Sequence, residues 1–130
     1  MPLASLLALA ATAVAPASSP ALGTWTNPRH TLAVRTAPCG QGQLCGAIVW
    51  AAPEAQSDAR EAGVTQLLGT ELLQDYRPAG QGSWRGRVYV PDMGRSFSSR
   101  LTLTGPNELT ISGCLVGNLF CRSQTWRRVG

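Results

Sequence analysis

The stretch WRGRVYVPDMGRSFSSRLTLT (84–104) decides the fold, because it holds two runs with the alternation of β-strands on either side of a turn. The turn is PDMG (91–94), in which Gly94 suits a positive φ, so the two runs, 84–90 and 95–104, predict a β-hairpin. Other short runs of this kind, bounded by Gly, Pro and Asn, lie at 23–27, 30–36, 43–51, 71–76, 107–113 and 122–129. A succession of strands without helices between them predicts an all-β fold, an antiparallel sandwich or barrel.

The number of strands and the chain length favour a small up-and-down barrel. An eight-stranded barrel is just wide enough to be filled by side chains or to hold one small ligand. Because the chain is near the lower limit for such a barrel, we expect any cavity to be shallow. Residues 52–70 form the one long connection, and we expect no more than a helical turn there, around Val64–Leu68.

The N-terminal segment MPLASLLALAATAVAPASSPAL (1–22) has the layout of a secretory signal peptide. An apolar run, Leu3–Ala15, is followed by small residues and proline, as in an apolar segment of about 7–15 residues before an A-x-A-like cleavage site. The run is too short to span a bilayer, which takes about 20 residues. Because no Lys or Arg precedes it, a buried N-terminal helix or a misassigned start codon remains an alternative.

Two cleavage points fit the segment, one before Ser18 and one before Leu22. We predict a signal peptide over 1–21 and a single domain over 22–130, located in the periplasm or secreted. No later apolar stretch is long enough to span a membrane, so we expect no membrane span.

The charge of the chain comes from arginine alone on the basic side. There are 11 Arg and no Lys, and the formal net charge is +4. The arginines are scattered along the sequence, whereas nucleic-acid binders cluster basic residues on one face or along a helix. Secretion and this scatter both argue against a nucleic-acid partner.

Four cysteines, Cys39, Cys45, Cys114 and Cys121, lie in the predicted domain. An even number of cysteines in a small secreted domain indicates disulfides, although three pairings are possible. We expect the two local pairs, Cys39–Cys45 and Cys114–Cys121, because each closes a short loop that contains glycine. A four-cysteine zinc site is the alternative, but its ligands usually come as C-x2-4-C pairs, and these gaps are longer.

The chain also resembles a bacterial family, domain of unknown function 2147. The resemblance rests on GTW (23–25), CGQGQLCGAIVW (39–50), LLGTELL (67–73), WRGRVYVPDMG (84–94) and GCLVGNLFCRSQTWRRV (113–129). It implies a secreted or envelope protein with a calycin-like, and so lipocalin-like, antiparallel barrel. It implies no activity.

Calycin-like barrels also imply a structural role for residues at both ends of the domain. An early Trp packs at the closed end of such barrels with a late Arg over it, an arrangement stabilised by cation–π attraction of about 0.5–2 kcal/mol. The corresponding residues are Gly23, Trp25, Trp126 and Arg128, and the resemblance favours Arg128 over Arg127 for the cation.

The strand 84–90 carries candidate ligand-binding residues. By alternation, Trp84 and Val88 face one side, while Arg85, Arg87 and Tyr89 face the other. If the second set points inward, its guanidiniums suit a carboxylate or phosphate ligand; if it points outward, it is a solvated face, which we favour for the two arginines.

Two further aromatic residues complete the predicted ligand cup. Trp50 ends its strand, where it either packs in the core or lines a pocket. Phe97 stands where a Tyr is common in the family. The predicted cup is Trp50, Arg87, Tyr89 and Phe97.

The segment between the last two cysteines is apolar for a surface loop. It contains Leu115, Val116, Leu119 and Phe120. These residues either fold back to cap the barrel or form an exposed apolar lip that contacts a partner.

Residues suited to catalysis or metal binding are sparse. His30 is the single histidine, and the acidic residues Glu54, Asp58 and Glu61 lack the density of a calcium site. We therefore predict a monomeric, non-enzymatic protein without cofactor or metal, which binds a small or lipidic ligand. The alternative is an envelope interaction module, such as a periplasmic inhibitor of a protease or cell-wall hydrolase.

Overall fold

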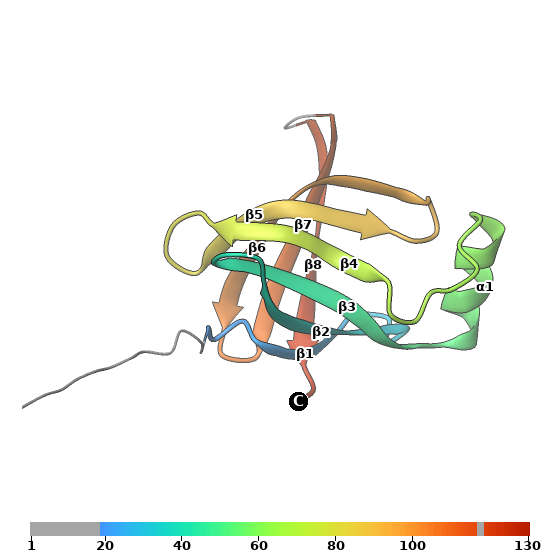
Figure 1. Cartoon of the computed structure of the whole chain (residues 1–130), viewed down its shortest axis with the longest axis horizontal. Coiled ribbons are helices and arrows are strands. Elements are labelled where there is room, and N and C mark those ends of the chain that lie inside the picture. The colour runs from blue at the N-terminus through green and yellow to red at the C-terminus, as the bar shows by residue number, and fades with distance from the viewer. Residues whose placement is uncertain (1–18, 117–118) are drawn as a thin grey trace, which may run out of the picture.

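The computed structural model describes residues 19–116 and 119–130, without the side chains of 115–120. Its strands are β1 (Gly23–Thr26), β2 (Leu32–Cys39), β3 (Gln43–Ala51), β4 (Glu71–Pro78), β5 (Ser83–Val90), β6 (Arg95–Gly105), β7 (Glu108–Val116) and β8 (Leu119–Arg128). Each strand pairs antiparallel with the next, and β1 pairs with β8 to close the barrel (Figure 1). This confirms the predicted all-β, up-and-down barrel.

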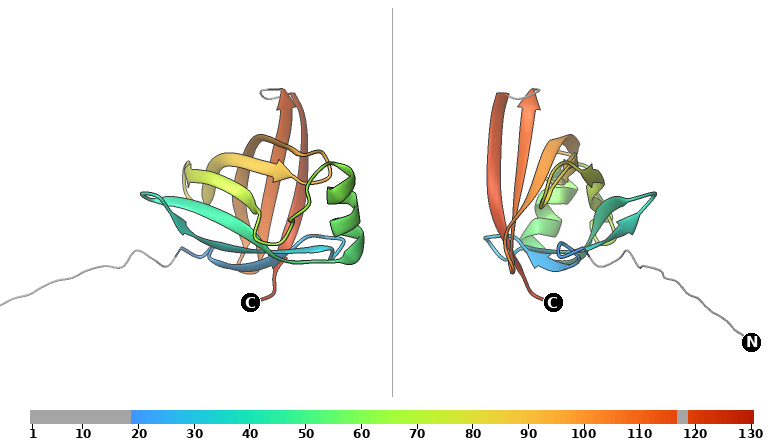
Figure 2. Two further views of the ribbon diagram at one scale, coloured as in Figure 1. Left: turned by 45° about the vertical axis from the view of Figure 1, so that its right-hand side comes forward. Right: turned by 90° about the vertical axis from the view of Figure 1, so that its left-hand side faces the viewer.

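The last hairpin is longer than the sequence suggested. Residues 115–116 and 119–120 belong to β7 and β8, with Val116 opposite Leu119, so the segment expected as an apolar loop is mostly strand. Figure 2 shows that the β7–β8 hairpin projects beyond the other strands. The partner contact predicted for Leu115, Val116, Leu119 and Phe120 concerns side chains outside the described part of the structure, so it stays a prediction.

The connection between β3 and β4 contains a helix, α1 (Pro53–Glu61), where we expected none. Its signals are Pro53 in the first turn, Glu54 near the N-terminus and Arg60 in the last turn, all favourable positions. The helix was missed because its buried side is made of alanine, including Ala59, which is fully buried, rather than of large apolar residues. The predicted helical turn around Val64–Leu68 is wrong, since α1 ends before Gly63, whose φ is 89°.

Both predicted disulfides are present. Cys39–Cys45 joins β2 to β3 with a Cα–Cα distance of 5.8 Å, and Cys114–Cys121 joins directly opposed residues of β7 and β8 with a Cα–Cα distance of 4.0 Å. Because all four thiols are used in these bonds, the zinc alternative is wrong.

Inward-facing side chains fill much of the barrel, and two glycines let them do so. A Cβ at Gly46 would lie 2.7 Å from Val34 Cγ1, and a Cβ at Gly86 would lie 2.7 Å from Tyr76 Cγ. Val34 and Tyr76 therefore occupy space that a larger residue would need, and both are fully buried.

The two ends of the barrel differ. In an up-and-down barrel, alternate connections lie at the same end. We call the end with connections 27–31, 52–70 and 91–94 the open end, and the end with connections 40–42, 79–82 and 106–107 the closed end.

The closed end is covered by an indole and a guanidinium. The Arg128 guanidinium lies 4.4 Å from the centroid of the Trp25 ring, and Trp25 is 1% exposed. This is the arrangement that the family resemblance implies for Gly23, Trp25 and Arg128, whereas Trp126 lies toward the open end. Gly23, with a φ of 150°, leaves room for Arg128, because a Cβ at Gly23 would collide with Arg128 Nη1.

Backbone carbonyls of the segment before β1 complete this closure. Trp25 Nε1 donates to the Ala21 carbonyl at 3.0 Å, and Thr36 Oγ1 donates to the same oxygen at 2.7 Å. Arg128 Nη1 and Nη2 donate to the carbonyls of Leu22 and Pro20 at 2.7 and 2.6 Å. The described residues before Gly23 are thus part of the folded domain.

Candidate ligand-binding cavity

The open end of the barrel contains a cavity of about 570 Å³. Ligand pockets in proteins commonly have volumes of about 300–1,000 Å³. The cavity therefore has room for a small molecule.

The floor of the cavity is apolar. It is formed by inward-facing side chains from five successive strands, Leu72, Val88, Phe97, Ile111 and Trp126. The indole of Trp126 is satisfied without a ligand, since its Nε1 donates to Gln124 Oε1 at 3.0 Å. A molecule that reaches the floor would therefore meet hydrocarbon and aromatic surface.

The mouth of the cavity carries charges of both signs. Arg29 and Glu54 form an ion pair at 3.4 Å, and both side chains are exposed. Asp58, Asp92 and Arg122 lie around the same opening. A polar rim above an apolar floor matches a ligand with an apolar body and a polar end.

Helix α1 forms one wall of this cavity. Ala55 and Asp58 line it, while Ala59 is fully buried beside them. The helix is attached to the barrel by Gln56 Nε2, which donates to the Ala51 carbonyl at 3.1 Å, and by the Arg29–Glu54 pair. Ala55 and Asp58 were not predicted to line a cavity, because no apolar periodicity marks the helix that carries them.

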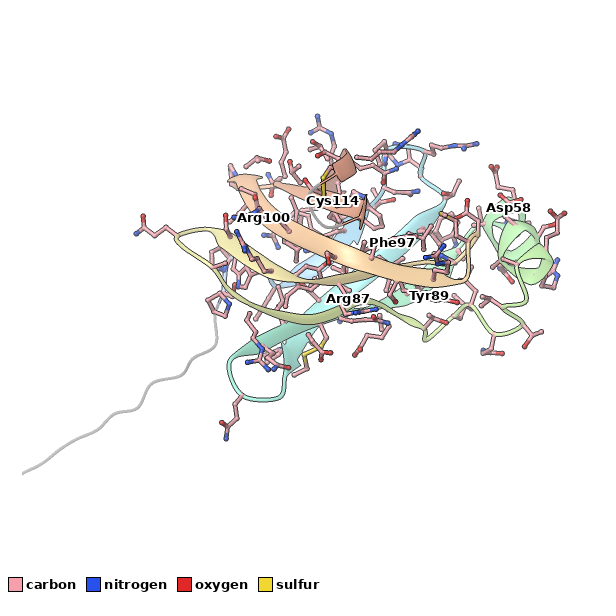
Figure 3. The ribbon with its side chains drawn as sticks, turned by 90° about the horizontal axis from the view of Figure 1, so that it is seen from above. Asp58, Arg87, Tyr89, Phe97, Arg100 and Cys114 are labelled. Atoms are coloured by element: carbon pink, nitrogen blue, oxygen red, sulfur yellow. A yellow bond between two sulfur atoms is a disulfide. The ribbon has the colours of Figure 1, made fainter. Side chains whose placement is uncertain are left out.

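Two of the four predicted cup residues lie at this cavity. Tyr89 and Phe97 line it, on the parts of β5 and β6 nearest α1 (Figure 3). Arg87 does not: its side chain is exposed on the outer face of β5, the direction we favoured for the arginines. Tyr89 differs from Arg87 because every residue at the end of β5, from Val88 to Val90, lines the cavity, as does Pro91 in the turn that follows.

Trp50, the fourth predicted cup residue, lies outside the cavity and outside the core. It is 49% exposed, because a β-bulge interrupts β3. Trp50 pairs with Ala33 but Ile48 pairs with Val34, so Val49 is an extra residue. The extra residue breaks the alternation on which the prediction depended, and both Val49 and Trp50 are exposed.

The barrel interior contains the phenol of Tyr76, which is not placed to act in catalysis. Tyr76 is fully buried, and among the described residues its hydroxyl has no hydrogen-bond partner. Burial raises the pKa of Tyr76 far above its usual range, with a smaller opposing effect from Ser99, whose own hydroxyl donates to the Ser112 carbonyl. The phenol therefore stays neutral and cannot serve as a base near neutral pH.

The single histidine lies outside the lining of the cavity. His30 is exposed and does not line it, so the described residues lend no support to an interior catalytic cluster that reaches His30. Over residues 19–116 and 119–130, no group of three or more His, Cys, Asp or Glu could hold a metal ion. No helix in this same part of the chain has the length and apolar character needed to cross a membrane.

An eight-stranded antiparallel barrel with an apolar cavity at one end is the architecture of lipocalin-like proteins. A similar solved structure is that of protein HP1028 from the human pathogen Helicobacter pylori, described as belonging to the lipocalin family. The TM-score is 0.63, the identity is 13%, and the match covers 84% of this chain and 82% of that one. At this identity the likeness shows the fold alone.

The sequence comparison identifies the family. A family model described as "uncharacterized protein conserved in bacteria (DUF2147)" matches residues 23–128, and the chain belongs to this family. No curated protein sequence matches the chain.

Proposed function

We propose that this protein binds one small molecule with an apolar body and a polar end in the cavity at the open end of the barrel. The observation that carries the proposal is the cavity itself, about 570 Å³ in volume, with an apolar floor and a charged rim. Binding without chemical conversion accords with the neutral Tyr76 and with the position of His30 outside the cavity lining.

We further propose that the protein acts outside the cytoplasm, in the periplasm or as a secreted protein. Disulfides persist in oxidising compartments and are rare in the cytosol, and the described chain has two. The apolar segment Leu3–Ala15 provides an export signal in this proposal.

Native mass spectrometry tests the binding proposal. The purified protein is incubated with a lipid extract of bacterial envelopes, and a bound mass of one small molecule is expected. Ile111→Trp places an indole in the cavity and should abolish the adduct. Thr110→Trp is the matched control, because the neighbouring Thr110 hydroxyl lies on the outer face near Thr125 Oγ1. An adduct that persists in Ile111→Trp, or only apo protein throughout, would contradict the proposal.

The interaction-module alternative depends on the tip of the β7–β8 hairpin. Its test is capture of an envelope protein by the wild type and by Leu119→Asp and Phe120→Asp variants. Unchanged capture by the variants would remove this alternative.

A further inference from the structure

Strand register brings together arginines that are scattered in the sequence. Arg77 on β4 lies opposite Arg85 on β5, and Arg85 lies opposite Arg100 on β6. Neighbouring strands are about 4.8 Å apart, so the three backbone positions form a short continuous row. Arg87, two residues along β5 from Arg85, lies beside them. We call these four residues the arginine row.

The arginine row faces away from the barrel interior. Its members alternate with inward-facing neighbours, such as Tyr76, Gly86 and Leu101. Arg77, Arg85 and Arg87 are exposed, and Arg100 is half-buried. Figure 3 shows Arg100 toward the end of β6 away from Phe97 and α1, so the row is separate from the cavity.

No carboxylate neutralises the arginine row in the described part of the chain. The ion pairs there, Arg29–Glu54 and Arg127–Glu108, involve other residues. Glu71 and Asp75 lie on β4 but form no ion pair with the row. Arg77 instead donates to Gln43 Oε1 from Nε at 3.2 Å and from Nη2 at 2.9 Å, once the Gln43 amide is oriented to accept.

Like charges directly opposite each other on adjacent strands are destabilising. The row contains two such pairs, Arg77–Arg85 and Arg85–Arg100, and no described carboxylate forms an ion pair with them. Natural proteins break such local rules mainly at functional sites. An external anion would relieve the repulsion, because each guanidinium can bind a carboxylate or phosphate through two parallel hydrogen bonds.

The same outer face continues as rows of hydroxyl groups. Arg100 lies opposite Ser112, and Ser112 lies opposite Ser123, with the two serine hydroxyls 2.8 Å apart. On the neighbouring row, Thr110 Oγ1 lies 3.3 Å from Thr125 Oγ1. A hydroxyl has one donor and two acceptor positions, so these groups can still bind a ligand.

We propose that this outer face of β4–β8 binds an acidic polysaccharide. The arginine row would pair with its anionic groups, and the Ser and Thr rows would hydrogen-bond its sugar hydroxyls. Among the described residues, the exposed large apolar side chains are Val49, Trp50, Leu68, Met93 and Val129, all outside this face. The described side chains of this face therefore offer neither the aromatic platforms that single-stranded nucleic acids need nor the apolar anchors of membrane-surface binding.

Binding is measured at physiological salt with a polyuronate of defined length as the probe. The double variant Arg85→Gln/Arg100→Gln should lose at least about tenfold in affinity, because it removes two guanidiniums that would form charge-assisted hydrogen bonds with the anionic groups. The matched control is Arg35→Gln/Arg60→Gln, which removes the same charge from β2 and α1. It should retain the wild-type affinity within about twofold, since exposed charges away from the contact are largely screened at this salt concentration.

Several outcomes would overturn the proposal. Equal losses in the two double variants would mean general charge attraction, and no measurable binding would refute the site. Tighter binding to anionic phospholipid vesicles or to an oligonucleotide of equal charge would identify a different partner. The Arg85→Gln/Arg100→Gln protein should unfold at the wild-type temperature or above it, because it loses repulsion; this separates loss of the site from loss of the fold.

Discussion

The closed and open ends of this barrel are made from the same eight strands, but they are completed in different ways. At the closed end, Arg128 covers Trp25 and binds backbone carbonyls of the segment before β1. At the open end, the apolar floor remains accessible and the charged side chains stand at the rim. One end is thus covered by the chain's own atoms, whereas the other leaves apolar surface accessible.

The largest expected effect compares one tryptophan at each end. Trp25→Ala should lower the free energy of unfolding by about 3–5 kcal/mol, as for other buried Trp→Ala changes. Trp126→Ala should have a smaller effect, because one side of Trp126 faces the cavity and its removal enlarges an existing space. Urea denaturation measures both. Equal losses would mean that the open end is packed as tightly as the closed end.

Removal of the segment before β1 tests the closure itself. A chain that begins at Leu22 lacks the Ala21 carbonyl, which accepts from Trp25 and Thr36, and the Pro20 carbonyl. It should unfold with a free energy roughly 2–4 kcal/mol below that of a chain beginning at Ser18, because buried donors lose their partners. Thermal or urea unfolding of the two chains decides the matter.

The same carbonyls predict the processing site. Cleavage before Ser18 would keep the Pro20 and Ala21 carbonyls that cover the closed end, whereas cleavage before Leu22 would remove both. If the chain is exported as we propose, its intact mass should correspond to 18–130, in place of the domain start at Leu22 expected from the sequence. A mass for 22–130 with unchanged stability would show that the closing contacts are dispensable.

The two disulfides offer a milder contrast. Replacing either pair by alanine should cost about 2 kcal/mol, since both close short loops. Loss of Cys39–Cys45, next to the closed end, should leave the cavity unchanged. Loss of Cys114–Cys121 should also weaken ligand binding, because Cys114 lines the cavity. Binding assays on both variants, at a temperature where each is folded, distinguish these effects.

The smallest effect is expected at the rim. Arg29→Ala breaks the exposed pair with Glu54 and should change stability by about 0–1 kcal/mol. Because Gln56 still holds α1 to the Ala51 carbonyl, hydrogen exchange in 53–61 should rise only slightly; a large rise would show that the ion pair is the main attachment. Glu54→Gln, which keeps a similar shape, is the control for loss of charge alone.

Local sequence patterns determined much of this protein by themselves. The eight strands, the PDMG turn and the two disulfides followed from alternation, turn chemistry and cysteine spacing. The family resemblance pointed to Trp25 and Arg128. These features could be predicted because each depends on residues close in sequence or on a pattern with a fixed period.

Only the tertiary structure decided the remainder. Helix α1 has a buried side of alanine, so no apolar period marks it. The bulge at Val49 turned Trp50 outward, and only the pairing of β3 with β2 reveals it. Register likewise brought Arg77, Arg85 and Arg100 into one row. Register and bulges depend on how distant strands meet, and a one-residue shift in pairing exchanges the inner and outer faces of a strand, so such features cannot be read along a single segment.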